Sequence, residues 1–161
     1  MNNMRRGFTM IELIFVIVII GILAAVAIPK LAATRSDATA AGCVHEAGQL
    51  VSEISAKYTA KGFSGFTDLT IAELTNIGTS ATTTGISELP TAVFHGAGKG
   101  ITYLCDGATL ITITGAQAST DYNLTVTMPA RADTDSPAVY AAKTALQQNM
   151  LQGQTTKQFK L

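Results

Sequence analysis

The organisation of this chain follows from residues 5–29, which read RRGFTMIELIFVIVIIGILAAVAIP. After two arginines and a glycine, an apolar run extends from Phe8 to Ile28, with Glu12 as its one acidic residue. At about 1.5 Å per residue, a helix over residues 8–28 would measure roughly 31 Å, close to the thickness of a bilayer's hydrocarbon core. The arginines precede the run, so the positive-inside bias places the amino terminus in the cytoplasm and the remainder of the chain outside.

Glu12 distinguishes this helix from an ordinary export signal or anchor. An ionised side chain among lipid tails costs roughly 2.5–3.5 kcal/mol on the insertion scale, which indicates that the carboxylate has a partner. A secretory signal is one alternative, with Ala25-Val26-Ala27 as its cleavage pattern, but its apolar region would be shorter and uncharged. A plain single-pass anchor is the other alternative, and it leaves Glu12 unexplained.

Residues 7–13, Gly-Phe-Thr-Met-Ile-Glu-Leu, together with Gly21 and Pro29, resemble the class III signal of type IV pilins and type II secretion pseudopilins. In that family, a membrane peptidase cuts after the glycine and methylates the new amino terminus. The resemblance therefore implies cleavage between Gly7 and Phe8, followed by N-methylation of Phe8. The motif covers about a fifth of the chain, and the rest resembles the family only in general organisation.

The resemblance also gives Glu12 a role, because it occupies the position of the family's fifth-residue glutamate. Cleavage would leave a cationic α-amino group on Phe8 at the membrane boundary. The Glu12 carboxylate of a neighbouring subunit can neutralise it, since opposite charges attract far more strongly in a low dielectric than in water. A pair within one chain competes, because Phe8 and Glu12 lie four residues apart on one helical face. Between subunits, the pair would fix the axial stagger of a polymer.

The chain is thus expected to have three parts: a leader at residues 1–7, a membrane and assembly helix at 8–28, and a globular domain at 29–161. Pro29 removes a backbone hydrogen bond, so a kink is expected near it. In the family, the helix loosens between the positions of Gly21 and Pro29 during assembly. Removing the leader leaves nine basic against 11 acidic residues, a formal charge of −2. No basic excess remains to attract nucleic acid.

The helix is expected to continue beyond Pro29 to a stop at Gly62, giving roughly 50 residues in all. Its second half is amphipathic, and Glu53 and Lys57 are spaced as an i,i+4 ion pair on the polar side. Apolar residues recur at steps of three to four along the other face: Cys43, Ala47, Leu50, Val51, Ile54 and Tyr58.

The rest of the sequence predicts an α+β fold, in which the long helix packs on an antiparallel sheet of three to four strands. A connection over residues 62–90 contains a capping box at Thr70–Glu73, with Gly78 closing the short helix. Period-two patterns follow at residues 101–105, 109–114 and 122–128, with an earlier strand near 92–95 and a tight turn at Asp106-Gly107. Ser136-Pro137 predicts the start of a C-terminal helix to about residue 151. Residues 153–161 are read as a tail or a final strand.

Cys43 and Cys105 fall on expected core faces. Outside the inner membrane they could form a disulfide, which would close a loop of about 62 residues and stabilise the domain by roughly 4 kcal/mol. Two buried free thiols are the alternative. In the family, disulfides usually close a loop near the carboxyl terminus, so this pairing would be atypical.

Few other residues suggest chemistry. Asn123 lies in an N-x-T sequon on the polar face of its strand, which makes it a candidate glycosylation site. Asp133 and Asp135 are read as a solvated turn, because two carboxylates alone make a weak calcium site. His45 and His95 lack metal-ligand partners at suitable spacing, and no nucleophile-elbow, P-loop or zincin motif occurs. We therefore expect no enzyme, no metal and no cofactor.

The sequence predicts a structural subunit of a type IV pilus-like fibre, polymerising with itself or with minor pilins. The resemblance implies a prepilin peptidase, an assembly ATPase and an inner-membrane platform protein as partners. It also implies storage in the bacterial inner membrane before assembly into a periplasmic or cell-surface fibre. A type II secretion pseudopilin supporting protein export is the alternative, although no aromatic-Pro turn near Phe63 marks one. A membrane-tethered binding module, using the Thr-rich sheet face, is a further hypothesis.

Overall fold

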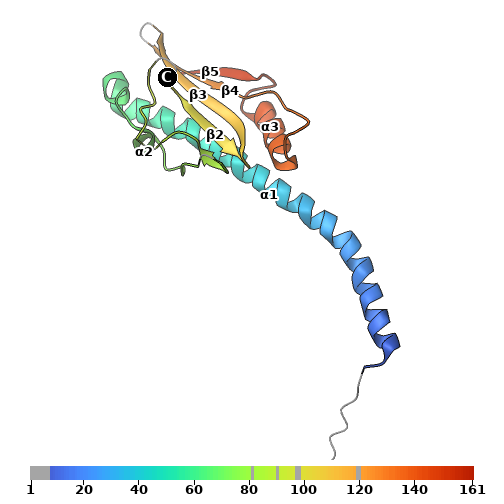
Figure 1. Ribbon diagram of the computed structural model, residues 1–161. Helices are drawn as coiled ribbons and strands as arrows, with labels where there is room; N and C mark the ends of the chain where they lie inside the picture. The colour runs from blue at the N-terminus through green and yellow to red at the C-terminus, as the bar shows by residue number, and fades with distance from the viewer. Residues whose placement is uncertain (1–7, 81, 90, 97–98, 119–120) are drawn as a thin grey trace, which may run out of the picture. The chain divides into compact units, whose positions relative to one another are not determined.

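The computed structural model describes residues 8–161, apart from residues 81, 90, 97–98 and 119–120 (Figure 1). The chain divides into two compact units, with the boundary between Arg35 and Ser36. The elements follow in the order α1 (Met10–Phe66), α2 (Ile71–Leu74), β1 (Gly85–Ile86), β2 (Ile101–Cys105), β3 (Ala108–Ala118), β4 (Asp121–Thr127), α3 (Pro137–Asn149) and β5 (Thr156–Lys160).

The first unit consists of the apolar half of α1. Its large side chains are exposed throughout, from Phe8 at 88% to Leu31 at 69%. The helix is long and apolar enough to cross a membrane. α1 includes Gly21 and Pro29 as helical residues, and the non-helical backbone angles within its described length belong to Gly62.

In the second unit, α1 buries one face against the sheet. The buried residues are Ala40, Cys43, Ala47, Leu50, Val51, Ile54 and Phe66, and this confirms the predicted apolar stripe. α1 breaks at Gly62 (φ 64°), where the stop was predicted, and one further helical turn then leads to its end at Phe66. The extra turn is held by aromatic packing, since Phe66 is fully buried with its ring 5.4 Å from that of Tyr58.

The connection after α1 contains the predicted short helix. Thr70 and Glu73 form the expected capping box, but α2 ends at Leu74, well before Gly78. The predicted pairing of Glu53 with Lys57 was also wrong. The Glu53 carboxylate instead accepts hydrogen bonds from the Thr75 hydroxyl, from the backbone N–H of Asn76 at 3.2 Å and from Gln49 at 2.8 Å. Tertiary donors thus replace the local ion pair and fix the end of α2 to α1.

The sheet has five antiparallel strands in the order β1-β2-β3-β4-β5, more than the three to four expected. β5 supplies the final strand, whereas the expected strand at residues 92–95 is absent, since Val93 makes only an isolated bridge with Thr70. The two-residue strand β1 takes that edge of the sheet instead. Asp106 and Gly107 form the predicted turn, both with positive φ (50° and 79°), as a type I′ hairpin turn requires.

A β-bulge alters the predicted alternation in β3. The register shifts between Tyr103 and Leu104, whose partners are Ile111 and Thr109. Leu110 is therefore the extra residue and its side chain is buried, while Thr109 is only half-buried. A bulge of this kind cannot be read from a period-two pattern, because it changes the face on which the following residues lie.

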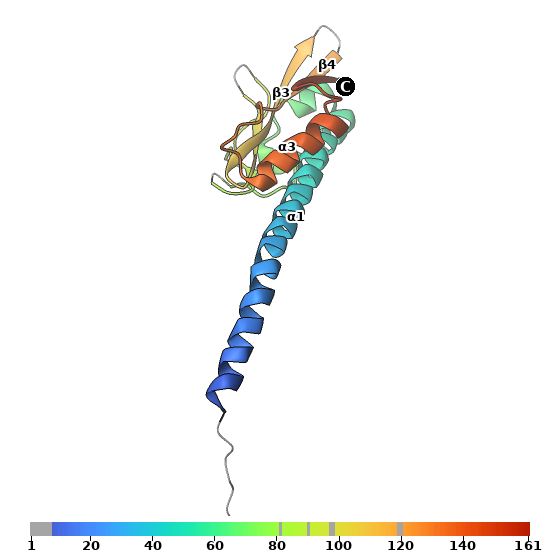
Figure 2. The same ribbon diagram turned by 90° about the vertical axis from the view of Figure 1, so that its right-hand side faces the viewer.

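The C-terminal helix forms as predicted. Ser136 caps α3 by accepting a hydrogen bond from the N–H of Val139. α3 contacts β3 and lies alongside the domain half of α1 (Figure 2). Residues of both helices line one shallow groove. Val139, Ala142 and Leu146 of α3 join the same core as α1 and the inner sheet face. The α+β pilin-like arrangement of a long helix on an antiparallel sheet is thereby confirmed.

Candidate functional site at the start of the apolar helix

Glu12, in the first turn of α1, is hydrogen-bonded to Thr9, the residue that precedes the helix. Thr9 donates two hydrogen bonds to Oε2 of Glu12, from the backbone N–H at 2.8 Å and from the hydroxyl at 2.7 Å. The N–H of Glu12 donates in return to the Thr9 hydroxyl at 3.3 Å. This is a capping box, in which a helix satisfies its own unpaired N–H groups. Thr9 was not among the predicted site residues, although Thr9-Met-Ile-Glu12 has the capping-box spacing.

The other residues of the processing motif have few contacts in the single chain. Gly7 lies outside the residues that the structure describes, and Phe8 is almost fully exposed. A Cβ added at Gly21 would meet no atom within 4 Å, so packing within one chain does not require glycine there. The predicted loosening between Gly21 and Pro29 stays a prediction. What the motif offers in one chain is an exposed apolar helix with a carboxylate at its start.

Cys43 and Cys105 are joined by a disulfide, with Cα atoms 5.8 Å apart, and both residues are buried. A polar contact lies beside it, because the Tyr103 hydroxyl donates a hydrogen bond of 2.7 Å to Oε2 of Glu46. Burial, followed by the Glu46 carboxylate, raises the pKa of Tyr103 well above its usual range. This contact joins the same two elements as the disulfide, namely α1 and β2.

Residues 131–134 form an exposed turn, as the sequence predicted, but the side chain of Asp135 is not solvated. Its carboxylate lies 2.8 Å from Nζ of Lys143, and the two side chains are 8% and 4% exposed. The backbone N–H of Ala132, followed by Lys143, lowers the pKa of Asp135. Asp133 is exposed and, among the described residues, no group of three or more His, Cys, Asp or Glu side chains could hold a metal ion. The ion pair was not predictable because α3 brings Lys143 to the turn.

The sequon asparagine lies within the sheet. Asn123 occupies β4 opposite Ala116 of β3 and Lys160 of β5, and it is half-buried. Thr125, the third residue of the sequon, has the same burial and, two residues along the strand, the same face. Any enzyme that modifies Asn123 in the folded domain would meet a backbone paired on both sides.

The two histidines, His45 and His95, lie in different environments. His45 is exposed on α1, whereas Nδ1 of His95 lies 2.9 Å from the Tyr122 hydroxyl. Tyr122 is buried and its ring stacks on that of Tyr58 at 5.0 Å. Burial, and secondarily Tyr58, raise the pKa of Tyr122 to about 12. The His95–Tyr122 contact therefore belongs to a cluster of packed aromatic rings, which gives His95 a structural role.

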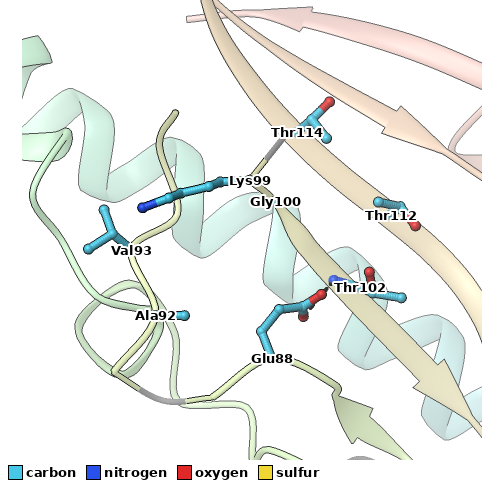
Figure 3. A pocket seen from close by; sticks show the side chains of 8 residues that line it. All are labelled: Glu88, Ala92, Val93, Lys99, Gly100, Thr102, Thr112 and Thr114. Atoms are coloured by element: carbon cyan, nitrogen blue, oxygen red, sulfur yellow. Dashed lines mark hydrogen bonds between the residues drawn. The ribbon is translucent and has the colours of Figure 1, made fainter. Parts of the chain in front are cut away.

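A cavity of about 440 Å³ lies between the segment before β2 and the outer sheet face (Figure 3). Glu88 and Lys99 line one side, and the hydroxyls of Thr102, Thr112 and Thr114 line the sheet. Oε2 of Glu88 accepts a hydrogen bond of 2.8 Å from the N–H of Thr102. This carboxylate therefore caps the edge of β2, which argues for a structural role rather than a catalytic one.

Comparison with known families identifies one segment. The model of the prokaryotic N-terminal methylation motif matches residues 2–28. The chain carries the class III signal peptide of type IV pilins and pseudopilins. No curated protein and no solved structure matches the chain significantly. The motif supports a pilin-like precursor, it belongs to a family of structural proteins, and it implies processing by a prepilin peptidase.

The match also explains the first unit of this pilin-like precursor. The class III signal and the apolar helix fit an inner-membrane-anchored precursor that assembles into a fibre. The apolar side chains of α1 in this unit are exposed in the single chain, as is typical of a helix that lies in a membrane.

Proposed function

We propose that this precursor is the structural subunit of a type IV pilus-like fibre. It is cut between Gly7 and Phe8, methylated at Phe8 and held in the inner membrane with its amino terminus in the cytoplasm. It then polymerises through its N-terminal helix. The observation that carries the proposal is an exposed apolar helix whose one carboxylate, Glu12, lies in its first turn next to the cleavage position.

The capping box suggests how Glu12 serves both before and after assembly. In the membrane, the two hydrogen bonds from Thr9 partly compensate the carboxylate for the loss of water. Both bonds end on Oε2, and a carboxylate offers lone pairs on each oxygen. Oε1 can therefore accept the amino group of a neighbour's Phe8 while Oε2 keeps its bonds to Thr9. The charge pair then gives the stagger between subunits, and the helix start keeps its cap.

The proposed partners are the proteins that process the precursor and assemble the fibre. A prepilin peptidase removes the leader, and an assembly ATPase acting through a platform protein extracts the subunit from the membrane. The fibre contains copies of this chain, alone or with minor pilins. A pseudopilin of type II secretion uses the same signal, and it remains the alternative that the motif supports equally. A membrane-tethered binding module would use the Thr-rich outer face instead.

The first test measures the intact mass of the chain in a sheared surface fraction and in washed membranes. A surface species that begins at methylated Phe8 is expected from a pilus subunit. Methylated chain found only in membranes would favour the pseudopilin. A soluble product starting at Ile28 would contradict both, because the assembly helix would then have been discarded.

Variants at two capping boxes test the role of Glu12. Glu12→Ala should abolish fibres while the chain remains in the membrane. Glu73→Ala is the matched control, because Glu73 makes the same bonds to Thr70, at 2.9 and 2.7 Å, within the globular domain. Fibre yield should be unaffected by the control. Equal yields from the two variants would show that Glu12 has only a capping role.

A further inference from the structure

The disulfide joins α1 to the sheet close to the point where α1 enters the domain. The second unit begins at Ser36, and the first buried residues of α1 are Ala40 and Cys43. The larger buried side chains, such as Leu50 and Ile54, lie further along the helix. A pull on α1 from its amino-terminal side therefore reaches the disulfide before it reaches most of the apolar contacts.

Apolar contacts alone would resist such a pull poorly. Each pair of atoms in contact contributes only about 0.1–0.2 kcal/mol, and the contacts of a helix on a sheet lie one turn after another. Tension along α1 would break them in sequence, beginning at Ala40, so that the force never has to break them all at once. A covalent bond near the entry point stops this peeling at its first turn.

The sheet end of the bond is suited to receive the tension. Cys105 is the last residue of β2, and β2 is paired with β1 on one side and with β3 on the other. Two residues earlier on the same strand, Tyr103 donates its hydrogen bond to Glu46, one helical turn beyond Cys43. The connection from α1 thus ends on an interior strand of the sheet.

We propose that the Cys43–Cys105 disulfide is a mechanical clamp, through which tension on the N-terminal helix passes directly into the sheet. The two cysteines are 62 positions apart, and residues 44–104 lie in the loop between them. Since the bond joins the two ends of this loop, the tension bypasses it. The bypassed segment contains most of the buried face of α1, the capped helix α2 and the ring cluster around Phe66. The clamp acts equally in a fibre and in a lone membrane-anchored chain.

Single-molecule pulling on the full chain in detergent tests the clamp. Handles are attached through azide-bearing amino acids at Lys30, on the apolar side of the boundary, and at Thr127, the exposed end of the interior strand β4. The wild-type chain should yield in one high-force step. The double variant Cys43→Ala, Cys105→Ala should yield first at a lower force and release roughly 200 Å more chain, the extended length of the bypassed loop.

Tyr103→Phe is the matched control, because it removes the hydrogen bond to Glu46 and keeps the disulfide. It should reproduce the wild-type step. If Tyr103→Phe yields as early as the double variant, the polar contact bears the force and the clamp is refuted. The clamp is also refuted if the double variant withstands the same force as the wild type, because the apolar contacts would then suffice.

A second measurement needs no cysteine variant. The wild-type chain is held at constant force below its yield point in the presence of a small thiol until a local opening of the domain exposes the buried disulfide to it. The thiolate attacks one sulfur, forms a mixed disulfide with it and expels the other cysteine as a thiolate. If the bond carries the tension, its cleavage is followed at once by extension of the bypassed loop. Cleavage without extension, verified afterwards by alkylation of the freed thiol, would show that other contacts carry the tension.

Discussion

Replacing Lys143 by methionine should destabilise the domain strongly. Nζ of Lys143 lies 2.8 and 3.1 Å from the two carboxylate oxygens of Asp135, and it also donates to the carbonyl of Ala130 at 3.2 Å. Both charged side chains are at least nine-tenths buried. Lys143→Met leaves the Asp135 carboxylate buried without its counter-charge, and such a loss typically costs about 3–5 kcal/mol.

Urea unfolding of the full chain in detergent, followed by circular dichroism, measures this loss. The double variant Lys143→Met, Asp135→Leu should recover most of the stability, because an apolar pair of similar volume often replaces a buried ion pair without net loss. Such a recovery would show that the single variant loses stability because of the unpaired charge and not because of a general packing defect. A single variant that loses less than about 1 kcal/mol would refute the reasoning, since that is the range of a solvent-exposed ion pair.

The same pair predicts a dependence on pH. The N–H of Ala132 and then Lys143 lower the pKa of Asp135 in the folded state. A carboxyl group with a lowered pKa stabilises the fold above its unfolded pKa, about 3.9, and this contribution is lost as the pH falls through the folded value. The wild-type chain should therefore lose stability below about pH 4. Lys143→Met should lose less stability over the same pH interval, because one of the two groups that lower the pKa of Asp135 has been removed.

Three further changes test other parts of the structure. Thr9→Val should reduce fibre yield, with Thr9→Ser retaining it, because only a hydroxyl completes the bonds to the carboxylate of the first turn. Gly115→Ala should destabilise the domain by about 1–3 kcal/mol in urea unfolding, since the new Cβ would lie 2.7 Å from Cζ of Tyr122. Gly78→Ala, which meets no neighbour within 4 Å, is its control. In ultraviolet titration, one tyrosine should ionise near pH 12, and this transition should be missing from Tyr122→Phe. The raised pKa of Tyr122 also stabilises the fold at pH values below about 10, and this contribution is lost as the pH rises from there toward 12.

The sequence predicted those parts of the fold that local chemistry determines. The apolar spacing from Cys43 to Ile54 gave the buried face of α1, and Ser136 before Pro137 gave the start of α3. Asp106-Gly107 gave the hairpin turn, because few other dipeptides accept positive φ at both positions. Each of these signals is contained within a few residues, so no tertiary contact is needed to read it.

The parts that could not be predicted depend on residues far apart in the chain. Glu53 binds Thr75 and Asn76 instead of Lys57, and Lys143 meets Asp135 only when α3 has docked. The bulge opposite Tyr103 moves Leu110 into the core, and its cause is the pairing of two strands rather than either strand alone. At the candidate site, the motif indicated Glu12, and the capping-box spacing of Thr9 and Glu12 could also have indicated Thr9, but that both of its bonds end on Oε2 required the structure.

The position of the Glu88 carboxylate affects whether neighbouring subunits can pair through the edges of their sheets. An open sheet with unpaired edges tends to pair with other sheets and to aggregate. At one edge β1 is only two residues long, and Glu88 occupies the N–H of Thr102 just beyond it. At the other edge β5 carries Lys157 and Lys160, charges that discourage a second strand from docking. These features discourage neighbouring subunits from joining through their sheets, which in the proposed fibre leaves the apolar helix free to direct assembly.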